Sequence, residues 1–117
     1  MAESTFLARM LAARERWVDL EADGPAVLVR RPAEARLPAL LLRGELEDYA
    51  GCVVDWRGFT EATLLGAALA SETPLRFDAA VWREVALDNV RWLQKVVDAV
   101  RADAETHLRA REEAAKN

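Results

Sequence analysis

The sequence predicts an α+β fold, in which a small antiparallel β-sheet (a hairpin plus a third strand) packs with helices and a long C-terminal helix follows. Three observations predict this class. Residues 21–25 read EADGP, which is turn chemistry between two short apolar runs. Residues 52–56 form another short run with β-branched side chains. Residues 78–100 repeat apolar side chains at helical spacing.

The composition is typical of a single α+β domain, which we place over residues 1–117. Hydrophobic residues make up 52% and charged residues 31% of the chain, a balance that excludes a disordered protein. No apolar run approaches the about 20 residues of a membrane span, so no membrane partner is expected. The net charge of −4 argues against nucleic acid as a partner. The single cysteine, Cys52, favours a reducing compartment, so the expected location is a cytoplasm.

The first expected element is a helix over residues 5–15, with Ser4 or Thr5 as its N-cap. A β-hairpin follows, with strands over residues 17–20 and 26–31 joined by the Asp-Gly-Pro turn. The face of the helix is defined by residues three or four positions apart: Phe6, Leu7, Met10, Leu11 and Arg14.

The middle of the chain alternates helical and extended patterns. Residues 32–51 have helical spacing, but Pro38 forbids one unbroken helix and leaves either a kink or two short helices. The third strand is expected over residues 52–56. Residues 60–69 form either a helical turn capped by Thr60 or a loop, since Gly66 and the small residues weaken a helix.

The last helical segment begins at Asp78, a favourable N-cap, where Phe77 can staple onto Trp82. The pair Asp88-Asn89 marks a candidate break that would divide the segment into two helices. Residues 101–117 consist of alanine and charge, so we expect a charged helical tail that leaves the core and can fray. One apolar stripe runs along the segment: Trp82, Val85, Asn89, Trp92, Val96 and Val100.

The aromatic residues are expected mainly in the core. Of the four tryptophans, at least three are assigned to it, and Trp92 is the one considered for an interface because the core runs out near it. The candidate partner-binding residues are therefore Trp92, Val96 and Val100, packing with the tail helix against a partner helix. One buried cluster is expected to contain Trp56, Phe77, Trp82 and Val85.

Catalytic machinery is not evident. His107, the single histidine, lies in the charged tail and is interpreted as a solvated helix residue. Cys52 opens an apolar strand and is interpreted as a buried structural thiol, although a reactive thiol would support a small enzyme. The acidic groups at 45–48 and 112–113 are interpreted as solvated helix faces. We therefore expect no catalytic residue, no cofactor, no metal site and no enzymatic activity.

The doublet Arg30-Arg31, directly before Pro32, has two interpretations. It could bind an acidic segment of a partner, or it could protect an edge strand against aggregation. We favour edge protection.

The stretch VVDWRGFTEATLLG at 53–66, followed by PLRFDAAVWREV at 74–85, resembles the small tail assembly chaperones of long-tailed bacteriophages and their prophages. In that family an extended segment ends in a Trp-x-Gly turn with an aromatic or aliphatic residue, and a Pro-x-x-Phe helix start and a Trp-bearing helix follow. The upstream VRRPAEA is similar to the family's RRP(T/A)-x-A passage. The alanine-rich insert at 64–71 and the tail after Val100 depart from the pattern. The matching positions are Trp56, Gly58, Phe59, Pro74, Phe77, Asp78 and Trp92.

The resemblance implies a fold and a function. Trp56 and Phe59 would close a sheet edge over the last helix. The family's proteins bind the long tape measure protein in the cytoplasm of the bacterial host, keep it soluble, and help to recruit tail tube subunits without remaining in the virion. Self-association is compatible with this role. The alternative is a structural protein of the phage particle, such as a head–tail connector or a minor tail component.

Overall fold

The computed structural model describes residues 2–66 and 71–116 and contains one three-stranded antiparallel sheet, in the order β1 (Glu15–Asp19), β2 (Ala26–Arg30) and β3 (Val53–Arg57). The α+β class is therefore confirmed, and the long C-terminal helix is present. The helices, in chain order, are α1 (Ala2–Ala12), the 3₁₀ turn η1 (Glu34–Arg36), α2 (Leu37–Arg43), α3 (Leu46–Ala50), α4 (Glu61–Leu65), α5 (Ala79–Leu87) and α6 (Val90–Lys116).

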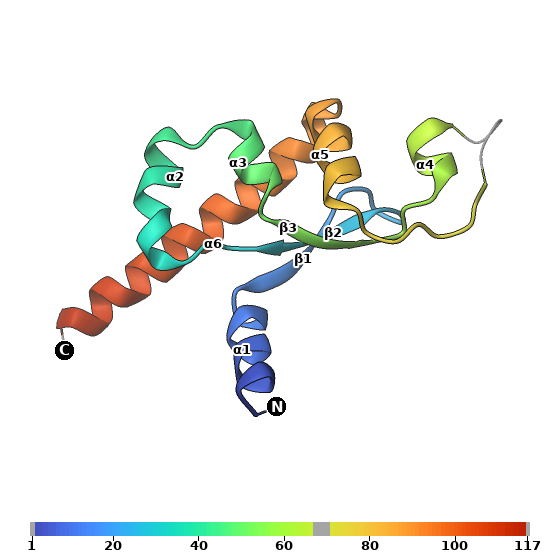
Figure 1. Ribbon diagram of the computed structural model, residues 1–117. Coiled ribbons are helices and arrows are strands. Elements are labelled where there is room, and N and C mark those ends of the chain that lie inside the picture. The colour runs from blue at the N-terminus through green and yellow to red at the C-terminus, as the bar shows by residue number, and fades with distance from the viewer. Residues whose placement is uncertain (1, 67–70, 117) are drawn as a thin grey trace.

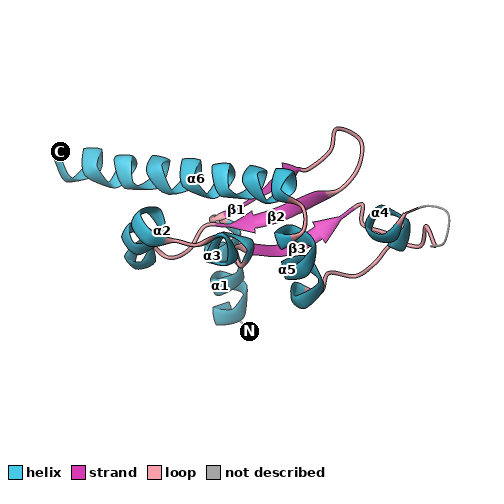
Figure 2. Ribbon diagram, turned by 90° about the horizontal axis from the view of Figure 1, so that it is seen from above, coloured by secondary structure: helices cyan, strands magenta, loops and turns pink. Residues whose placement is uncertain are grey.

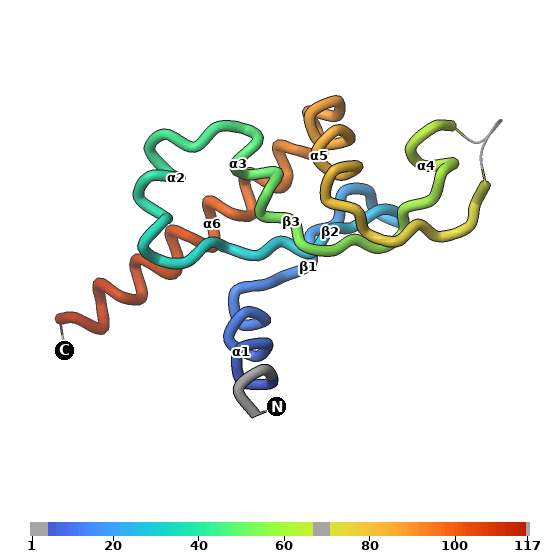
Figure 3. Tube along the Cα trace, in the orientation of Figure 1, coloured from blue at the N-terminus to red at the C-terminus, as the bar shows by residue number. Residues whose placement is uncertain are grey.

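The hairpin forms around the predicted turn, with β1 beginning two residues before the expected strand. Trp17 lies opposite Leu28, and the backbone N–H of Leu20 donates to the carbonyl of Pro25 across the turn. The chain then leaves the sheet through η1, α2 and α3 before it returns as β3, as Figure 3 traces. Because β3 pairs with β2, the strand β2 is central and its Arg30 end is not a sheet edge.

The two faces of the sheet have different surroundings. In Figure 1, α2, α3 and α5 lie above the sheet and α1 projects below it. Helix α6 contacts β1 and β2, and α3 and α5 pack on α6. Figure 2 shows α6 running alongside the sheet and extending beyond it at its C-terminal end. On the other face Trp17 is 38% exposed and contacts the guanidinium of Arg57, 4.4 Å from the ring centroid.

The core holds an aromatic cluster built from the motif residues. Trp56 stacks on Phe59 with ring centroids 4.4 Å apart, and Phe59 also meets Trp82 of α5 and Trp92 of α6 edge-on. The ring of Phe77 packs edge-on against Trp56, with ring centroids 5.3 Å apart. Of the expected cluster, Trp56 and Trp82 are buried, whereas Phe77 and Val85 are partly buried against it. Phe59 thus contacts both α5 and α6, whereas the ring contacts of Trp56 are with Phe59 and Phe77.

Hydrogen bonds join the segment that carries Trp56 and Phe59 to the segment around Leu75, on the other side of α4. The Trp56 indole N–H donates to the carbonyl of Leu75 over 2.8 Å, and the backbone N–H of Leu75 donates to the carbonyl of Phe59, also over 2.8 Å. Thr60 and Pro74 form an isolated antiparallel bridge. Gly58 makes the turn between the two rings with φ of +76°, a conformation that favours glycine. The segment after β3 is therefore held against the segment before α5.

Several helix boundaries follow the predicted caps. Asp78 accepts hydrogen bonds from the N–H groups of Ala80 and Val81 at the start of α5, and Thr60 caps α4. The helical alternative for the region after Thr60 is thus correct over Glu61–Leu65, while residues 67–70 lie outside the described part. Asn89 separates α5 from α6 and caps α6 by accepting from the Trp92 N–H, so the expected break is confirmed.

Other boundaries differ from expectation. Helix α1 begins at Ala2, before the proposed caps, and ends at Ala12 because Glu15 already pairs in β1. Pro38 does not break its helix, because it sits in the first turn of α2, where a missing N–H costs nothing. The division into two short helices falls instead at Gly44, where the backbone is extended and a capping box of Glu45 and Asp48 starts α3.

Candidate functional site

The proposed partner surface on the last helix is not exposed. Trp92 is 8% exposed, and Val96 and Val100 are completely buried in the core that α6 forms with the sheet. The expectation of an exposed apolar stripe is therefore wrong. Three of the four tryptophans are indeed buried, but the exception is Trp17, not Trp92.

The charged residues beside this stripe suggested that it faces solvent. Their side chains instead bind other parts of the same protein. The Lys95 ammonium donates to the carbonyl of Leu20 over 2.6 Å, and the Arg101 guanidinium donates to the hydroxyl of Tyr49 over 3.0 Å. The Trp92 indole donates to the Glu21 carboxylate over 2.9 Å, which lowers the pKa of Glu21. Long cationic side chains can pack along an apolar surface while their heads reach polar partners.

The tail also stays on the body of the protein for at least its first half. Ala104 is completely buried, and Arg16 of β1 pairs with Asp103 at 3.0 Å. His107 contacts the Glu34 carboxylate at 2.7 Å, and Arg111 contacts the same carboxylate at 2.9 Å. The core therefore continues past Val100, and His107 is not the solvated residue that the sequence suggested.

Neutralising Glu34 should loosen this attachment. In a Glu34→Gln variant we expect faster amide hydrogen exchange over residues 107–116, with little change over residues 90–100. Hydrogen bonds from His107 and then Arg111 lower the pKa of Glu34. Its contribution is therefore complete above the ordinary carboxyl pKa and is lost as the pH falls through the lower folded-state value. Unchanged exchange in the variant at neutral pH would contradict this attachment.

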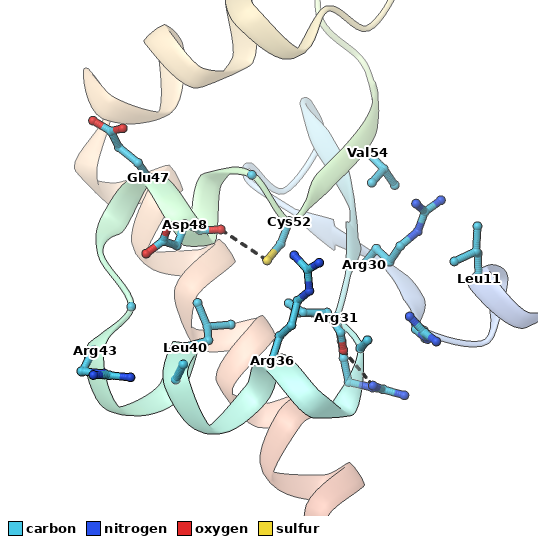
Figure 4. A pocket seen from close by; sticks show the side chains of 16 residues that line it. Leu11, Arg30, Arg31, Arg36, Leu40, Arg43, Glu47, Asp48, Cys52 and Val54 are labelled. Atoms are coloured by element: carbon cyan, nitrogen blue, oxygen red, sulfur yellow. Dashed lines mark hydrogen bonds between the residues drawn. The ribbon is translucent and has the colours of Figure 1, made fainter.

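A groove opens where the end of α1, the end of β2, η1, α2 and the α3–β3 turn meet (Figure 4). Its volume is about 860 Å³. The apolar part of its lining includes Leu40 of α2, which is 9% exposed, and Cys52, which is 7% exposed. Leu11 of α1 and Val54 of β3 complete this apolar surface. The groove thus joins segments that are far apart in the sequence.

Arginines dominate the polar part of the groove. They are Arg14, Arg30, Arg31, Arg36 and Arg43, facing only two acidic residues, Glu47 and Asp48. Figure 4 shows the Arg36 side chain reaching across the groove toward Cys52.

The five arginines differ in how far they are already paired. Arg30 forms two hydrogen bonds with Glu15, at 2.9 and 2.6 Å, and Arg31 donates to the carbonyl of Pro32 over 2.9 Å. Within residues 2–66 and 71–116, Arg14, Arg36 and Arg43 have no ion pair. Three guanidinium groups are thus available to a ligand.

The position of the Arg30-Arg31 doublet rules out one of its two interpretations. Edge protection is wrong, because β2 lies between β1 and β3. Arg31 instead lines the groove, where burial and then the neighbouring Arg14 lower the pKa of its guanidinium. Sequence reasoning found the doublet but missed Arg14, Arg36 and Arg43. Arg36 and Arg43 are seven residues apart, or two helical turns, and this spacing was the signal that they share a face with Leu40.

Cys52 lies in the groove as a neutral thiol. It contacts the carbonyl of Asp48 at 3.5 Å, and burial followed by the Asp48 charge raises its pKa to about 11. This agrees with the interpretation of a buried structural cysteine.

The neutral state of the Cys52 thiol should make its alkylation slow. With the pKa raised from 9.0 to about 11, the thiolate fraction near neutral pH is about a hundredfold lower than for an unperturbed thiol. We expect iodoacetamide to react with Cys52 correspondingly slowly in the folded protein, and the rate to rise steadily toward pH 11. Unfolding in urea should restore the ordinary rate. Rapid reaction in the folded state at neutral pH would revive the hypothesis of a catalytic cysteine.

The other sequence candidates have structural partners or form no site. Asp48 and Glu45 cap α3, and Glu47 pairs with Arg83 of α5. In the described part of the chain, no group of three His, Cys, Asp or Glu side chains is placed to hold a metal ion. None of the described helices is both long and apolar enough to cross a membrane.

Exposed apolar side chains gather on α1, which contacts mainly β1. Phe6 is 61%, Leu7 is 54% and Met10 is 45% exposed. Such a set on one projecting helix is typical of a contact surface.

Comparison with protein families, with curated proteins and with solved structures gives no significant match for this chain.

Proposed function

We propose that this protein is a tail assembly chaperone of a long-tailed bacteriophage or prophage. It would bind the tape measure protein in the cytoplasm of the bacterial host, keep it soluble, and assist the assembly of tail tube subunits. This is a binding function without catalysis.

The observation that carries the proposal is the arrangement of the residues behind the family resemblance. Trp56 and Phe59 meet Phe77 in one aromatic cluster, although α4 and its flanking loops separate Phe77 from them in the sequence. Gly58 supplies the turn between the first two rings, and Asp78 starts the following helix. Positions that a family shares for its fold are expected to form one connected unit of this kind, whereas a chance match would leave them scattered.

The exposed side chains of α1 support the same function. A chaperone for a long helical protein needs apolar side chains that are fixed in position by its fold but remain exposed to solvent. Phe6 and Met10 lie four residues apart on α1, with Leu7 beside them, and all three are about half exposed or more. A helix with such a face can pack along an apolar stripe of a partner helix.

Co-expression tests the proposal. The tape measure protein encoded in the same genome should be recovered soluble and bound to this protein, and should be insoluble when expressed alone. A Phe6→Ser/Met10→Ser variant should fold normally and recover less of the partner. The control is Leu42→Ser, which changes a side chain that is 83% exposed on α2.

Two outcomes would contradict the proposal. A tape measure protein that stays insoluble with this protein present would exclude the chaperone function. Detection of the protein as a stoichiometric component of purified virions would favour the alternative, a head–tail connector or minor tail component.

A further inference from the structure

We propose that the arginine groove binds an acidic segment of a partner protein, with carboxylates on the free guanidinium groups and apolar side chains against Leu40 and Val54. This deepens the proposed function, and it rests on that function only in naming the tape measure protein as the source of the segment.

The charge of the groove is opposite to the charge of the chain. The chain carries a net charge of −4, yet five arginines and only two acidic residues line this one groove. In the described part of the chain, Arg14, Arg36 and Arg43 have no ion pair, so their like charges repel one another and a bound anion would relieve this repulsion. A ligand of opposite charge is therefore favoured at this place.

The acidic residue closest in sequence to Arg31 and Arg36 is hydrogen-bonded to α6. Glu34 lies between Arg31 and Arg36 in the sequence, but its carboxylate binds His107 and Arg111 of α6. These contacts direct the hydrogen bonds of the Glu34 carboxylate to α6, although its charge still partly offsets the burial that lowers the pKa of the nearby Arg31. They also hold the end of α6 at η1.

A carboxylate-bearing peptide fits the groove better than a nucleic acid does. Guanidinium groups bind carboxylates through two parallel hydrogen bonds, and the apolar surface of Leu11, Leu40 and Val54 suits leucine-sized side chains. A nucleic acid needs a continuous basic face for successive phosphates. Glu47 and Asp48 interrupt such a face where α3 borders the groove.

Peptide binding tests the inference directly. The probe is a short fluorescein-labelled peptide of leucine and glutamate, and its anisotropy is measured with the intact protein at low and high salt. We expect binding that weakens as salt rises. A matched peptide of leucine and glutamine and a single-stranded oligothymidylate should bind at least roughly tenfold more weakly.

Matched charge reversals locate the binding site. Arg36→Glu with Arg43→Glu changes two exposed groove side chains and should weaken the leucine–glutamate peptide at least roughly tenfold. Arg91→Glu with Arg109→Glu produces the same change in net charge on exposed positions of α6 outside the groove, and should leave the affinity within about twofold. Circular dichroism of both variants controls for folding.

Three results of the binding measurements would overturn the inference. They are an equal loss of affinity in both double variants, equal binding of the glutamine peptide, or an oligonucleotide that binds as tightly as the glutamate peptide and depends on Arg36 and Arg43. The test is separate from that of the proposed function. If the peptide binds in the groove but the tape measure protein is not solubilised, the chaperone function is wrong and the groove assignment stands. If the partner is solubilised equally by the groove variants, only the groove assignment fails.

Discussion

Replacing Trp82 with alanine is expected to lower the free energy of unfolding by about 3–5 kcal/mol, the loss typical of a large aromatic side chain removed from a core. Trp82 is 1% exposed, and its ring meets Phe59 edge-on at a centroid distance of 6.3 Å. Its indole N–H donates to the carbonyl of Ala50 over 3.0 Å, so the variant would also leave that carbonyl without this donor. Urea denaturation followed by circular dichroism measures the change.

Trp17→Ala is the matched control for this experiment. Trp17 is 38% exposed on the face of the sheet away from α6, where the guanidinium of Arg57 lies over its ring. Its removal should cost less than about 1.5 kcal/mol, because an exposed cation–π contact contributes only about 0.5–1 kcal/mol. A loss for Trp82→Ala below about 1 kcal/mol would show that α5 does not bury this face.

Gly58→Ala is expected to lower the free energy of unfolding by more than the about 1–3 kcal/mol that a strained backbone conformation costs by itself. Gly58 has φ of +76°, and an added Cβ would lie 2.9 Å from the carbonyl oxygen of Gly24. That oxygen belongs to the backbone of the hairpin turn, so it cannot move aside as a flexible side chain would. The variant therefore strains the turn between Trp56 and Phe59 and also displaces the β1–β2 turn.

Gly66→Ala separates these two causes. Gly66 also has a positive φ, of +96°, but among the residues that the structure describes a Cβ there meets no atom within 4 Å. It should show the cost of the backbone conformation without the clash. We expect Gly58→Ala to be the more destabilising of the two by at least about 1 kcal/mol in thermal or urea denaturation. Equal losses would show that the approach of Gly24 contributes nothing.

The sequence predicted those parts of the fold that depend on local chemistry. The turn at Asp23-Gly24, the cap at Asp78 and the break at Asn89 are each determined by a few neighbouring residues, and each is present. The helix boundary at Gly44 was not predicted, because the interruption of the helix was expected at Pro38. A proline looks the same in the sequence whether it interrupts a helix or occupies its first turn, as Pro38 does.

The candidate site was harder to predict, for two physical reasons. Trp92, Val96 and Val100 were predicted to be exposed because charged residues lie beside them in the sequence. That prediction was wrong, because a charged side chain such as that of Lys95 can bind the backbone of the same protein and leave its apolar neighbours buried. The groove depends on α1, β2, α2 and β3 coming together, and no local pattern encodes that meeting. Only its Arg30-Arg31 part was visible in the sequence.

The contacts of α6 determine when the protein can fold during synthesis. This helix contacts β1, β2, α3 and α5, and its Val96, Val100 and Ala104 are completely buried. The sheet and the preceding helices therefore cannot bury their apolar faces until α6 has been made. Because a ribosome synthesises the chain from its N-terminus, the three strands emerge before α6 does. Until α6 follows, the nascent chain therefore exposes the apolar side chains of the sheet and of α3 and α5 that this helix covers in the folded protein.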